Sequence, residues 1–180
     1  MDVAVDDRSV TQAPLPESTD VLVIGAGPAG SSAAAWASRT GRTTVLADSA
    51  VFPRDKTCGD GLTPRAVAEL DRLGLGPWVR SKVANRGLRL SGFGQELELE
   101  WPSGSFPTVG SAVPRSELDD RIRATAVSSG AIMTQGAKAV DVEYIGDRVR
   151  AVRFRTADGE RTVRCEKLIV ADGVRSPLGK

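Results

Sequence analysis

The sequence of 180 residues contains no histidine, only two cysteines and no long uninterrupted hydrophobic run. Because no imidazole is present, a Ser/His/Asp or Cys/His relay, a histidine-ligated zinc site and a histidine general base are all excluded within this chain. Proton chemistry must therefore use carboxylates, lysines, Tyr144, a cysteine or a cofactor.

The two cysteines, Cys58 and Cys165, lie far apart in the sequence and form no CxxC pair. This spacing argues against a disulfide scaffold and against a thiolate metal site, so we expect no metal and a reducing compartment, the cytoplasm. Cys165 falls in a predicted strand and is interpreted as a core residue. The formal net charge is only +1, so the whole chain has no field that would attract nucleic acid or an anionic membrane.

The longest uncharged run covers residues 21–38, but it contains three glycines, a proline and three serines. It is too polar for a membrane span, and the acidic residues before it are opposite to the basic start of a signal peptide. A length of 180 residues with 41% hydrophobic residues suits one domain, so we expect a single core.

The N-terminal part of the chain divides into a tail and a βαβ unit. Residues 1–19 mix acidic residues with prolines and show no periodicity, so we expect a disordered tail there. A short apolar, β-branched run at residues 21–24 is typical of a strand buried on both faces. A glycine-rich turn, an alanine-rich helix over residues 29–40 and a second strand over residues 43–47 follow.

The glycine-rich turn at residues 25–30 reads GAGPAG and matches GxGxxG. Gly25 permits a tight turn, Gly27 lets a pyrophosphate approach the backbone, and Gly30 lets the helix pack close to the strand. Asp48, at the end of the second strand, is placed to accept hydrogen bonds from an adenosine ribose and disfavours a 2′-phosphate. The pattern predicts FAD or NAD. A tight turn that binds nothing would leave the glycines and Asp48 unexplained together.

The middle of the chain shows weaker patterns. Residues 49–62 read as a loop, in which Arg54, Asp55 and Lys56 are interpreted as a solvated charged run. The expected regular elements are a helix from Thr63-Pro64 to Gly74, two short strands around residues 92–95 with alternating leucines, a helix over residues 116–128 and a strand over residues 131–134.

The C-terminal part of the chain has three strand-like stretches, at residues 139–145, 148–156 and 162–171. They predict an antiparallel meander that leads into a last strand and the turn Asp172-Gly173. A doubly wound sheet normally has more strands, so we interpret the chain as the N-terminal part of a longer protein.

A meander that ends in an Ala-Asp-Gly turn resembles the FAD-binding domain of glutathione-reductase and p-hydroxybenzoate-hydroxylase type flavoproteins. Within that group, FPRDKTCGDGLTPRA at residues 52–66 is similar to the signature of the geranylgeranyl reductase family, which saturates isoprenoid double bonds with reduced FAD. The runs at residues 58–70, 91–94 and 110–123 are most similar to the menaquinone-reducing members of that family.

The resemblance implies an α/β, Rossmann-like FAD-binding fold with a three-stranded antiparallel meander. Residues 20–180 would form the N-terminal part of the FAD-binding domain, and a substrate domain and a C-terminal FAD segment would be absent. Asp48 stands where the wider superfamily more often has glutamate, which keeps the carboxylate but shortens its reach.

The resemblance also implies a set of FAD contacts, each on a position that matches the family pattern. Ala29 and Gly30 would face the pyrophosphate and Asp48 the ribose, while Asp172-Gly173 would close the sheet beneath the flavin. The remaining implied contacts are the backbone of Cys58, Gly59 and Gly61 at the flavin, Arg115 at the phosphate or ribityl region, and the backbone of Ala139 at the adenine.

The implied activity is FAD-dependent reduction of an isoprenoid or quinone lipid, with an external electron donor and peripheral membrane contact through the missing part. Cys58 is the candidate proton donor, or only its backbone takes part. Two alternatives stay open: a flavin-dependent aromatic monooxygenase, and an isolated FAD-binding module without turnover.

Overall fold

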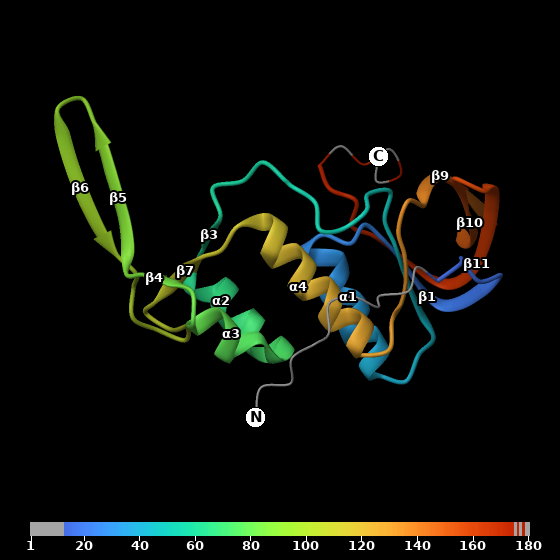
Figure 1. Cartoon of the computed structure of the whole chain (residues 1–180), viewed down its shortest axis with the longest axis horizontal. Coiled ribbons are helices and arrows are strands. Elements are labelled where there is room, and N and C mark those ends of the chain that lie inside the picture. The colour runs from blue at the N-terminus through green and yellow to red at the C-terminus, as the bar shows by residue number, and fades with distance from the viewer. Residues whose placement is uncertain (1–12, 175, 177, 179–180) are drawn as a thin grey trace. The chain divides into compact units, whose positions relative to one another are not determined.

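The computed structural model describes residues 13–174, 176 and 178, and most of its elements are labelled in Figure 1. The chain divides into two compact units, unit 1 with Met1–Arg54 and Asp119–Lys180, and unit 2 with Asp55–Leu118. We expected one core, whereas the chain packs as two compact units, and the predicted domain boundaries stay a prediction. The loop after the second strand leads into a segment with its own helices and small sheets, so the two units are described separately.

Unit 1 is built on a mixed six-stranded sheet with the strand order β8-β2-β1-β11-β10-β9. Strands β1, β2, β8 and β11 pair in parallel, and β9, β10 and β11 pair antiparallel as the predicted meander. The strands are β1 (Ser18–Ile24), β2 (Thr44–Ala47), β8 (Ile132–Thr134), β9 (Lys138–Ile145), β10 (Arg148–Thr156) and β11 (Gly159–Val170). The predicted α/β fold class with a meander is therefore confirmed.

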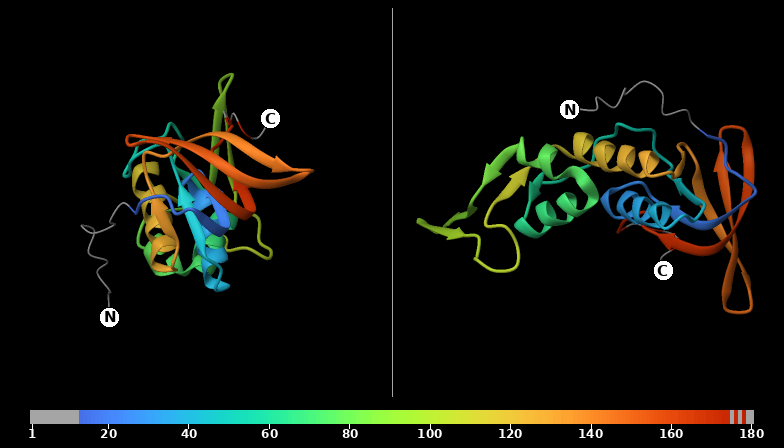
Figure 2. Two further views of the ribbon diagram at one scale, coloured as in Figure 1. Left: turned by 90° about the vertical axis from the view of Figure 1, so that its right-hand side faces the viewer. Right: turned by 90° about the horizontal axis from the view of Figure 1, so that it is seen from below.

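The core of unit 1 lies on both faces of β1 and β2. Leu22, Val23, Val45 and Leu46 are fully buried, as the apolar runs predicted. Leu22 and Val45 pack into one cluster with meander residues such as Phe154, so by alternation Val23 and Leu46 face the other side. Helix α1 (Pro28–Arg39) contacts β1 and β2, and Figure 2 shows it beside the C-terminal part of helix α4 (Arg115–Ser128).

Strand β11 joins the meander to the parallel sheet. Its first half pairs antiparallel with β10, from Gly159 to Arg164, and its second half pairs parallel with β1, from Arg164 to Val170. One strand of 12 residues thus supplies both the predicted third meander strand and the strand before the Asp172-Gly173 turn.

The expected disordered tail, residues 1–19, lies only partly within the described residues. Residues 1–12 lie outside them. Ala13 N–H donates to the Met133 carbonyl at 3.3 Å, the Thr134 hydroxyl donates to the Ala13 carbonyl at 2.8 Å, and β1 already begins at Ser18. The expectation was therefore wrong for residues 13–19, because pairing beside existing strands does not need an apolar pattern.

Unit 2 combines short helices with two small sheets. Strands β3 (Gly61–Leu62), β7 (Gly110–Ala112) and β4 (Val83–Asn85) form one antiparallel sheet, and β5 (Gly87–Gly92) pairs with β6 (Gln95–Glu100) as the predicted hairpin. The three strands of the first sheet were missed because each has only two or three residues.

The helical part of unit 2 is longer than predicted. Helix α2 (Pro64–Leu70) begins as expected, with the Thr63 hydroxyl accepting a hydrogen bond from Ala66 N–H at 3.3 Å. A π-type turn (η1, Asp71–Leu75) follows, and Gly74 with φ +98° breaks the helical conformation. Helix α3 (Gly76–Arg80) starts again at once, with proline in its first turn, so Gly74 marks a kink and not the end of the helical region. Within the described residues, no helix is both long and apolar enough to span a membrane.

Candidate functional site

The glycine-rich turn of unit 1 connects β1 to α1, and two of its glycines are required by the packing of the protein itself. Gly25 has φ +97°, and a Cβ on it would lie 2.4 Å from the Ala171 carbonyl oxygen. A Cβ on Gly30 would lie 1.8 Å from the Gly25 carbonyl oxygen and 3.2 Å from Ala171 Cβ. No side chain fits at either position, so α1 starts in close contact with the end of β11.

Gly27 differs from both of these glycines. Its φ of −69° suits any residue, and the nearest described atom that a Cβ would meet, Arg54 Nη2, is 3.7 Å away. Neither backbone conformation nor packing therefore requires glycine here. Gly27 is the N-cap of α1, no described side chain caps that helix end, and Ala29 in the first turn is exposed. This open, partially positive helix end fits an anionic group such as a pyrophosphate.

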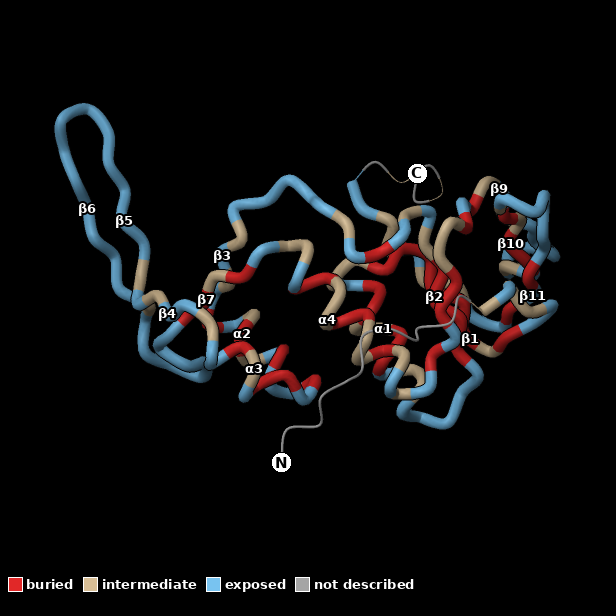
Figure 3. Tube along the Cα trace, viewed as in Figure 1, coloured by how far each residue is buried: buried red, intermediate tan, exposed pale blue. Residues whose placement is uncertain are grey.

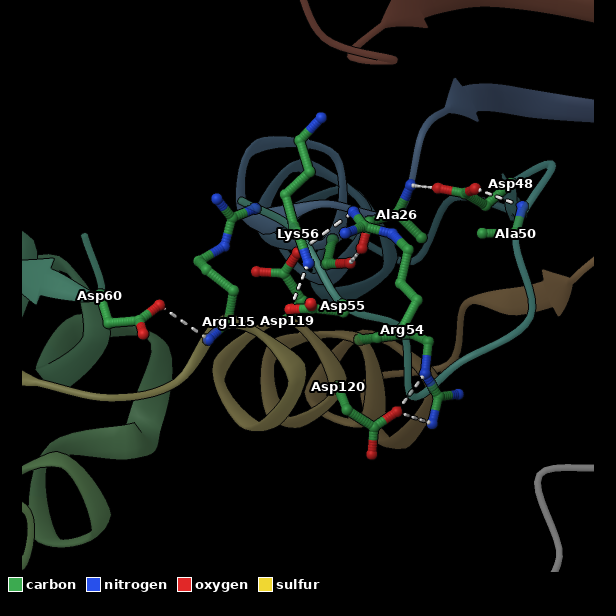
Figure 4. Close-up of polar contacts among 12 residues, drawn as sticks. Ala26, Asp48, Ala50, Arg54, Asp55, Lys56, Asp60, Arg115, Asp119 and Asp120 are labelled. Carbon is green, nitrogen blue, oxygen red and sulfur yellow. Dashed lines mark hydrogen bonds and ion pairs between the residues drawn. The ribbon is translucent and has the colours of Figure 1, made fainter. Parts of the chain in front are cut away.

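Asp48 follows β2 and makes two backbone contacts with its carboxylate, drawn in Figure 4. Oδ2 accepts a hydrogen bond from Ala26 N–H at 2.6 Å, and Oδ1 accepts one from Ala50 N–H at 2.7 Å. The sequence predicted a carboxylate directed at a ribose. The structure shows that Asp48 also fastens the glycine-rich turn to the loop after β2. Each oxygen keeps a second lone pair, so these contacts leave room for a ribose hydroxyl.

The start of β9 lies next to Asp48. Ala137 N–H donates to the Asp48 carbonyl at 2.9 Å, and Gly136 N–H donates to the Ala50 carbonyl at 3.4 Å. Ala139, two residues further on, is buried in β9, which is an edge strand of the sheet. The topology therefore brings Ala139, Asp48 and the glycine-rich turn to one end of the sheet.

Arg54 is the residue of unit 1 that the sequence interpretation missed. It was placed in a solvated loop run, but its Nη2 lies 3.1 Å from Oδ2 of Asp119, which is fully buried. Its guanidinium carbon is 4.9 Å from the centre of the Phe52 ring, and its Nη1 is buried without a described hydrogen-bond partner. Lys56 is exposed, as expected. The signal was absent from the sequence because Asp119 lies on a distant helix.

Asp172, beside Gly25 of the glycine-rich turn, also has a buried polar atom without a described hydrogen-bond partner, as Arg54 does. Ala171 N–H donates to the Ile24 carbonyl at 2.7 Å, and Asp172 Oδ1 is buried without a described partner. Buried polar atoms without partners are rare in folded proteins. Arg54 Nη1 and Asp172 Oδ1, one donor and one acceptor, therefore fit an additional polar group at this end of the sheet.

In unit 2, the loop with Cys58, Gly59 and Gly61 is attached to the start of α4 through Asp60. Asp60 Oδ1 accepts a hydrogen bond from Arg115 N–H at 3.2 Å, as Figure 4 shows, and the Asp60 carbonyl accepts one from Val113 N–H at 3.0 Å. A Cβ on Gly59 would meet no described atom within 4 Å, and one on Gly61 would meet only the Gly59 carbonyl oxygen at 3.8 Å. The loop backbone is therefore open to a ligand.

Cys58 is exposed in this loop, and its pKa is lowered from the usual thiol value. The main cause is a hydrogen bond from Asp60 N–H, and the second is a hydrogen bond from the Arg115 side chain, both of which stabilise the thiolate. The structure thus places Arg115 beside Cys58. Burial raises the pKa of the Cys165 thiol, which is a core residue as predicted.

Each unit therefore gathers part of the predicted set. Unit 1 brings Gly25, Gly27, Ala29, Gly30, Asp48 and Ala139 to one end of its sheet, and unit 2 brings Cys58, Gly59, Gly61 and Arg115 together.

Comparison with known proteins gives a consistent assignment. The model of the family described as FAD binding domain matches residues 18–180. The menaquinone reductase of Mycobacterium tuberculosis is 61% identical over 164 residues, which cover 91% of this chain and 40% of that protein. The digeranylgeranylglycerophospholipid reductase of Picrophilus torridus is 32% identical over 163 residues, 89% of this chain and 41% of that protein.

Among solved structures, the myxobacterial chondrochloren halogenase CndH, an FAD-dependent halogenase, has a TM-score of 0.82 and 25% identity. The match covers 90% of this chain and 39% of the halogenase chain. This chain thus spans about 40% of the length of the relatives it matches.

Proposed function

Because the chain belongs to the FAD binding domain family, we propose that the full-length protein is an FAD-dependent oxidoreductase that reduces a carbon–carbon double bond of an isoprenoid, in the side chain of menaquinone. The observation that carries this proposal is the 61% identity to a menaquinone reductase over 91% of the chain. The similarity to a digeranylgeranylglycerophospholipid reductase supports an isoprenoid substrate at a lower level of identity.

The geometry of unit 1 supports a role in holding the nucleotide part of FAD. We assign the backbone at Gly27, Ala29 and Gly30 to the pyrophosphate, since this helix end is open and uncapped. The guanidinium of Arg54 lies beside Gly27 and can add charge-assisted hydrogen bonds to the same group. Asp48 would accept the ribose hydroxyls, and the backbone of Ala139 would contact the adenine.

FAD, when bound and reduced, would supply a hydride for one carbon of the double bond. An alkene of this kind is a poor hydride acceptor, so a proton must reach the other carbon, and we assign this proton to the Cys58 thiol. The lowered pKa makes Cys58 a stronger acid, and Asp60 N–H and Arg115 stabilise the thiolate that remains. Solvent then returns the proton, because Cys58 is exposed. In the alternative assignment only the backbone of Cys58, Gly59 and Gly61 contacts the flavin.

The electron donor is external, and the lipid substrate implies peripheral contact with a membrane through parts of the protein outside this chain. We also propose that the 180-residue chain alone has no turnover, since it spans about 40% of its relatives.

The test uses the full-length protein with bound FAD, reduced with dithionite without oxygen and mixed with menaquinone in detergent. We expect the menaquinone side chain to gain two hydrogens, as measured by mass spectrometry. An unchanged side chain with fully reduced enzyme would contradict the proposal. Oxygen consumption with a hydroxylated product from an aromatic acid would instead support a monooxygenase.

A further inference from the structure

The β5–β6 hairpin of unit 2 has one strongly apolar face. Leu88 pairs with Leu99, and Leu90 pairs with Leu97. Side chains of paired residues project to the same face of a sheet, so these residues form one surface, which we call the leucine face. The four leucines are 50%, 53%, 54% and 44% exposed in the order Leu88, Leu90, Leu97 and Leu99. Figure 3 shows the hairpin as an almost wholly exposed segment.

The opposite face of the hairpin carries charged and polar side chains. Arg89 pairs with Glu98 and Ser91 with Glu96. The Arg89 side chain donates to Glu98 Oε1 from Nε at 2.9 Å and forms an ion pair with Glu96 at 3.4 Å. A sheet with one polar and one apolar face is the pattern of a sheet that buries only one side. The leucine face therefore has the residue pattern of the buried side of a sheet.

The base of the hairpin is fixed, although its leucine face is bare. Trp101 Nε1 donates to Asn85 Oδ1 at 2.7 Å, and Trp101 N–H donates to the Arg86 carbonyl at 2.9 Å. A Cβ on Gly87 would lie 2.1 Å from the Leu99 carbonyl oxygen, so the two strands are in close contact there. Isolated two-stranded hairpins are only marginally stable in water, so this one needs a further partner along its length.

We propose that in the full-length protein the polypeptide outside this chain covers the leucine face. The relatives show how much chain is available, since this chain matches only about 40% of their length. The charge of the hairpin disfavours an anionic membrane as the partner, because Glu96, Glu98 and Glu100 outnumber Arg89. The hairpin also leaves one edge of each strand unpaired in its two-stranded sheet, so the same polypeptide can extend the sheet.

The experiment compares two neighbouring positions on opposite faces in the full-length protein. Leu90→Cys and Ser91→Cys variants are labelled with iodoacetamide under native conditions, and each site is followed by peptide mass spectrometry. Glu96 lies beside Ser91, so its carboxylate would affect the pKa of a cysteine at position 91. Each labelling rate is therefore measured as a function of pH and divided by the fraction of that cysteine present as thiolate. We expect the cysteine at position 90 to react at least about tenfold more slowly than the one at position 91, since it reacts only after local opening.

A second pair on the other strand, Leu97→Cys and Glu98→Cys, repeats the comparison if the first pair disturbs folding. Equal rates within both pairs would overturn the proposal. A difference that disappears on dilution would assign the leucine face to a second copy of the protein. A difference that appears only with added phosphatidylcholine vesicles would assign it to a lipid surface, and either result overturns the proposal.

Discussion

The predicted cofactor-binding residues of unit 1 and those of unit 2 are held in different ways. In unit 1, Gly25 and Gly30 are required by close backbone packing, and Asp48 is held by two backbone N–H groups. In unit 2, Cys58 and Gly59 are exposed in a loop that Asp60 attaches to the start of α4. The glycine-rich turn is thus fixed by close backbone packing, while the backbone of the Cys58 loop has open space around it.

The fold of this chain is shared by proteins other than the reductases. A halogenase with 25% identity has the same fold, whereas the reductases match at higher identity. We expect substitutions of Arg54, Gly30 and Asp48 in unit 1 to lower stability or FAD binding, and substitution of Cys58 to change reactivity with little effect on stability.

The largest effect is expected from Arg54→Met. This variant leaves the fully buried Asp119 without the guanidinium, and breaking one side of a buried ion pair costs about 3–5 kcal/mol. The free energy of unfolding from urea titration measures it. Adding Asp119→Asn should recover part of the loss, and Lys56→Met, two residues away and exposed, should stay within about 0.5 kcal/mol of the wild type. Equal stability of Arg54→Met and Lys56→Met would show that the buried pair contributes nothing.

The next effect is expected from Gly30→Ala. Its new methyl group would lie 1.8 Å from the Gly25 carbonyl oxygen, and relief of such overpacking costs about 1–3 kcal/mol or more. The shifted turn should also lose FAD. Thermal unfolding and the flavin content after gel filtration measure both effects, and a variant with wild-type values for both would show that α1 can move away at no cost.

Asp48→Ala should lower FAD affinity about ten- to a hundredfold, because a hydrogen bond to a charged group contributes about 1.5–3 kcal/mol. The loss includes the contacts to Ala26 and Ala50, which hold the turn in place. Titration of the apoprotein with FAD gives the dissociation constant. Asp48→Asn, which keeps one acceptor oxygen, should fall between the alanine variant and the wild type, and unchanged binding in Asp48→Ala would rule out the ribose assignment.

The smallest effect on stability is expected at Cys58. Its lowered pKa means that alkylation should reach half of its maximal rate at a lower pH than for an ordinary thiol, and Arg115→Gln should move this midpoint upward. Cys165, with its raised pKa and buried side chain, should stay unreactive over the same range. Cys58→Ser should keep the wild-type unfolding temperature. A Cys58 midpoint at or above that of a free thiol would contradict the role of Asp60 and Arg115.

The local parts of unit 1 could be predicted from the sequence because each carries its own pattern. The apolar run of β1, the GxGxxG turn and the alanine-rich helix lie next to one another in the chain, and Asp48 ends the next apolar run. The hairpin β5–β6 was visible in the alternation of leucines. Residues close in sequence decide all of these features.

The features that could not be predicted depend on residues far apart in the sequence. Arg54 was read as solvated because its partner, Asp119, lies on α4, and the backbone contacts of Asp48 depend on how the turn and the loop meet. The division into two units was missed because composition alone does not show which segments pack together. The alternation of leucines in β5 and β6 predicts that one face of the hairpin is buried. It does not show whether residues of this chain bury that face.

The most direct test of cofactor binding at the glycine-rich turn is the FAD content of the full-length protein and of its Gly27→Ala variant. At Gly27 neither the backbone nor the protein's own packing requires glycine, so an alanine should change the unfolding temperature of the apoprotein only slightly. The wild type should be yellow with a flavin absorption spectrum, and the variant should bind FAD at least about tenfold more weakly because its methyl group occupies the space of the pyrophosphate. Equal FAD affinity at equal stability would contradict the claim that this turn holds the cofactor.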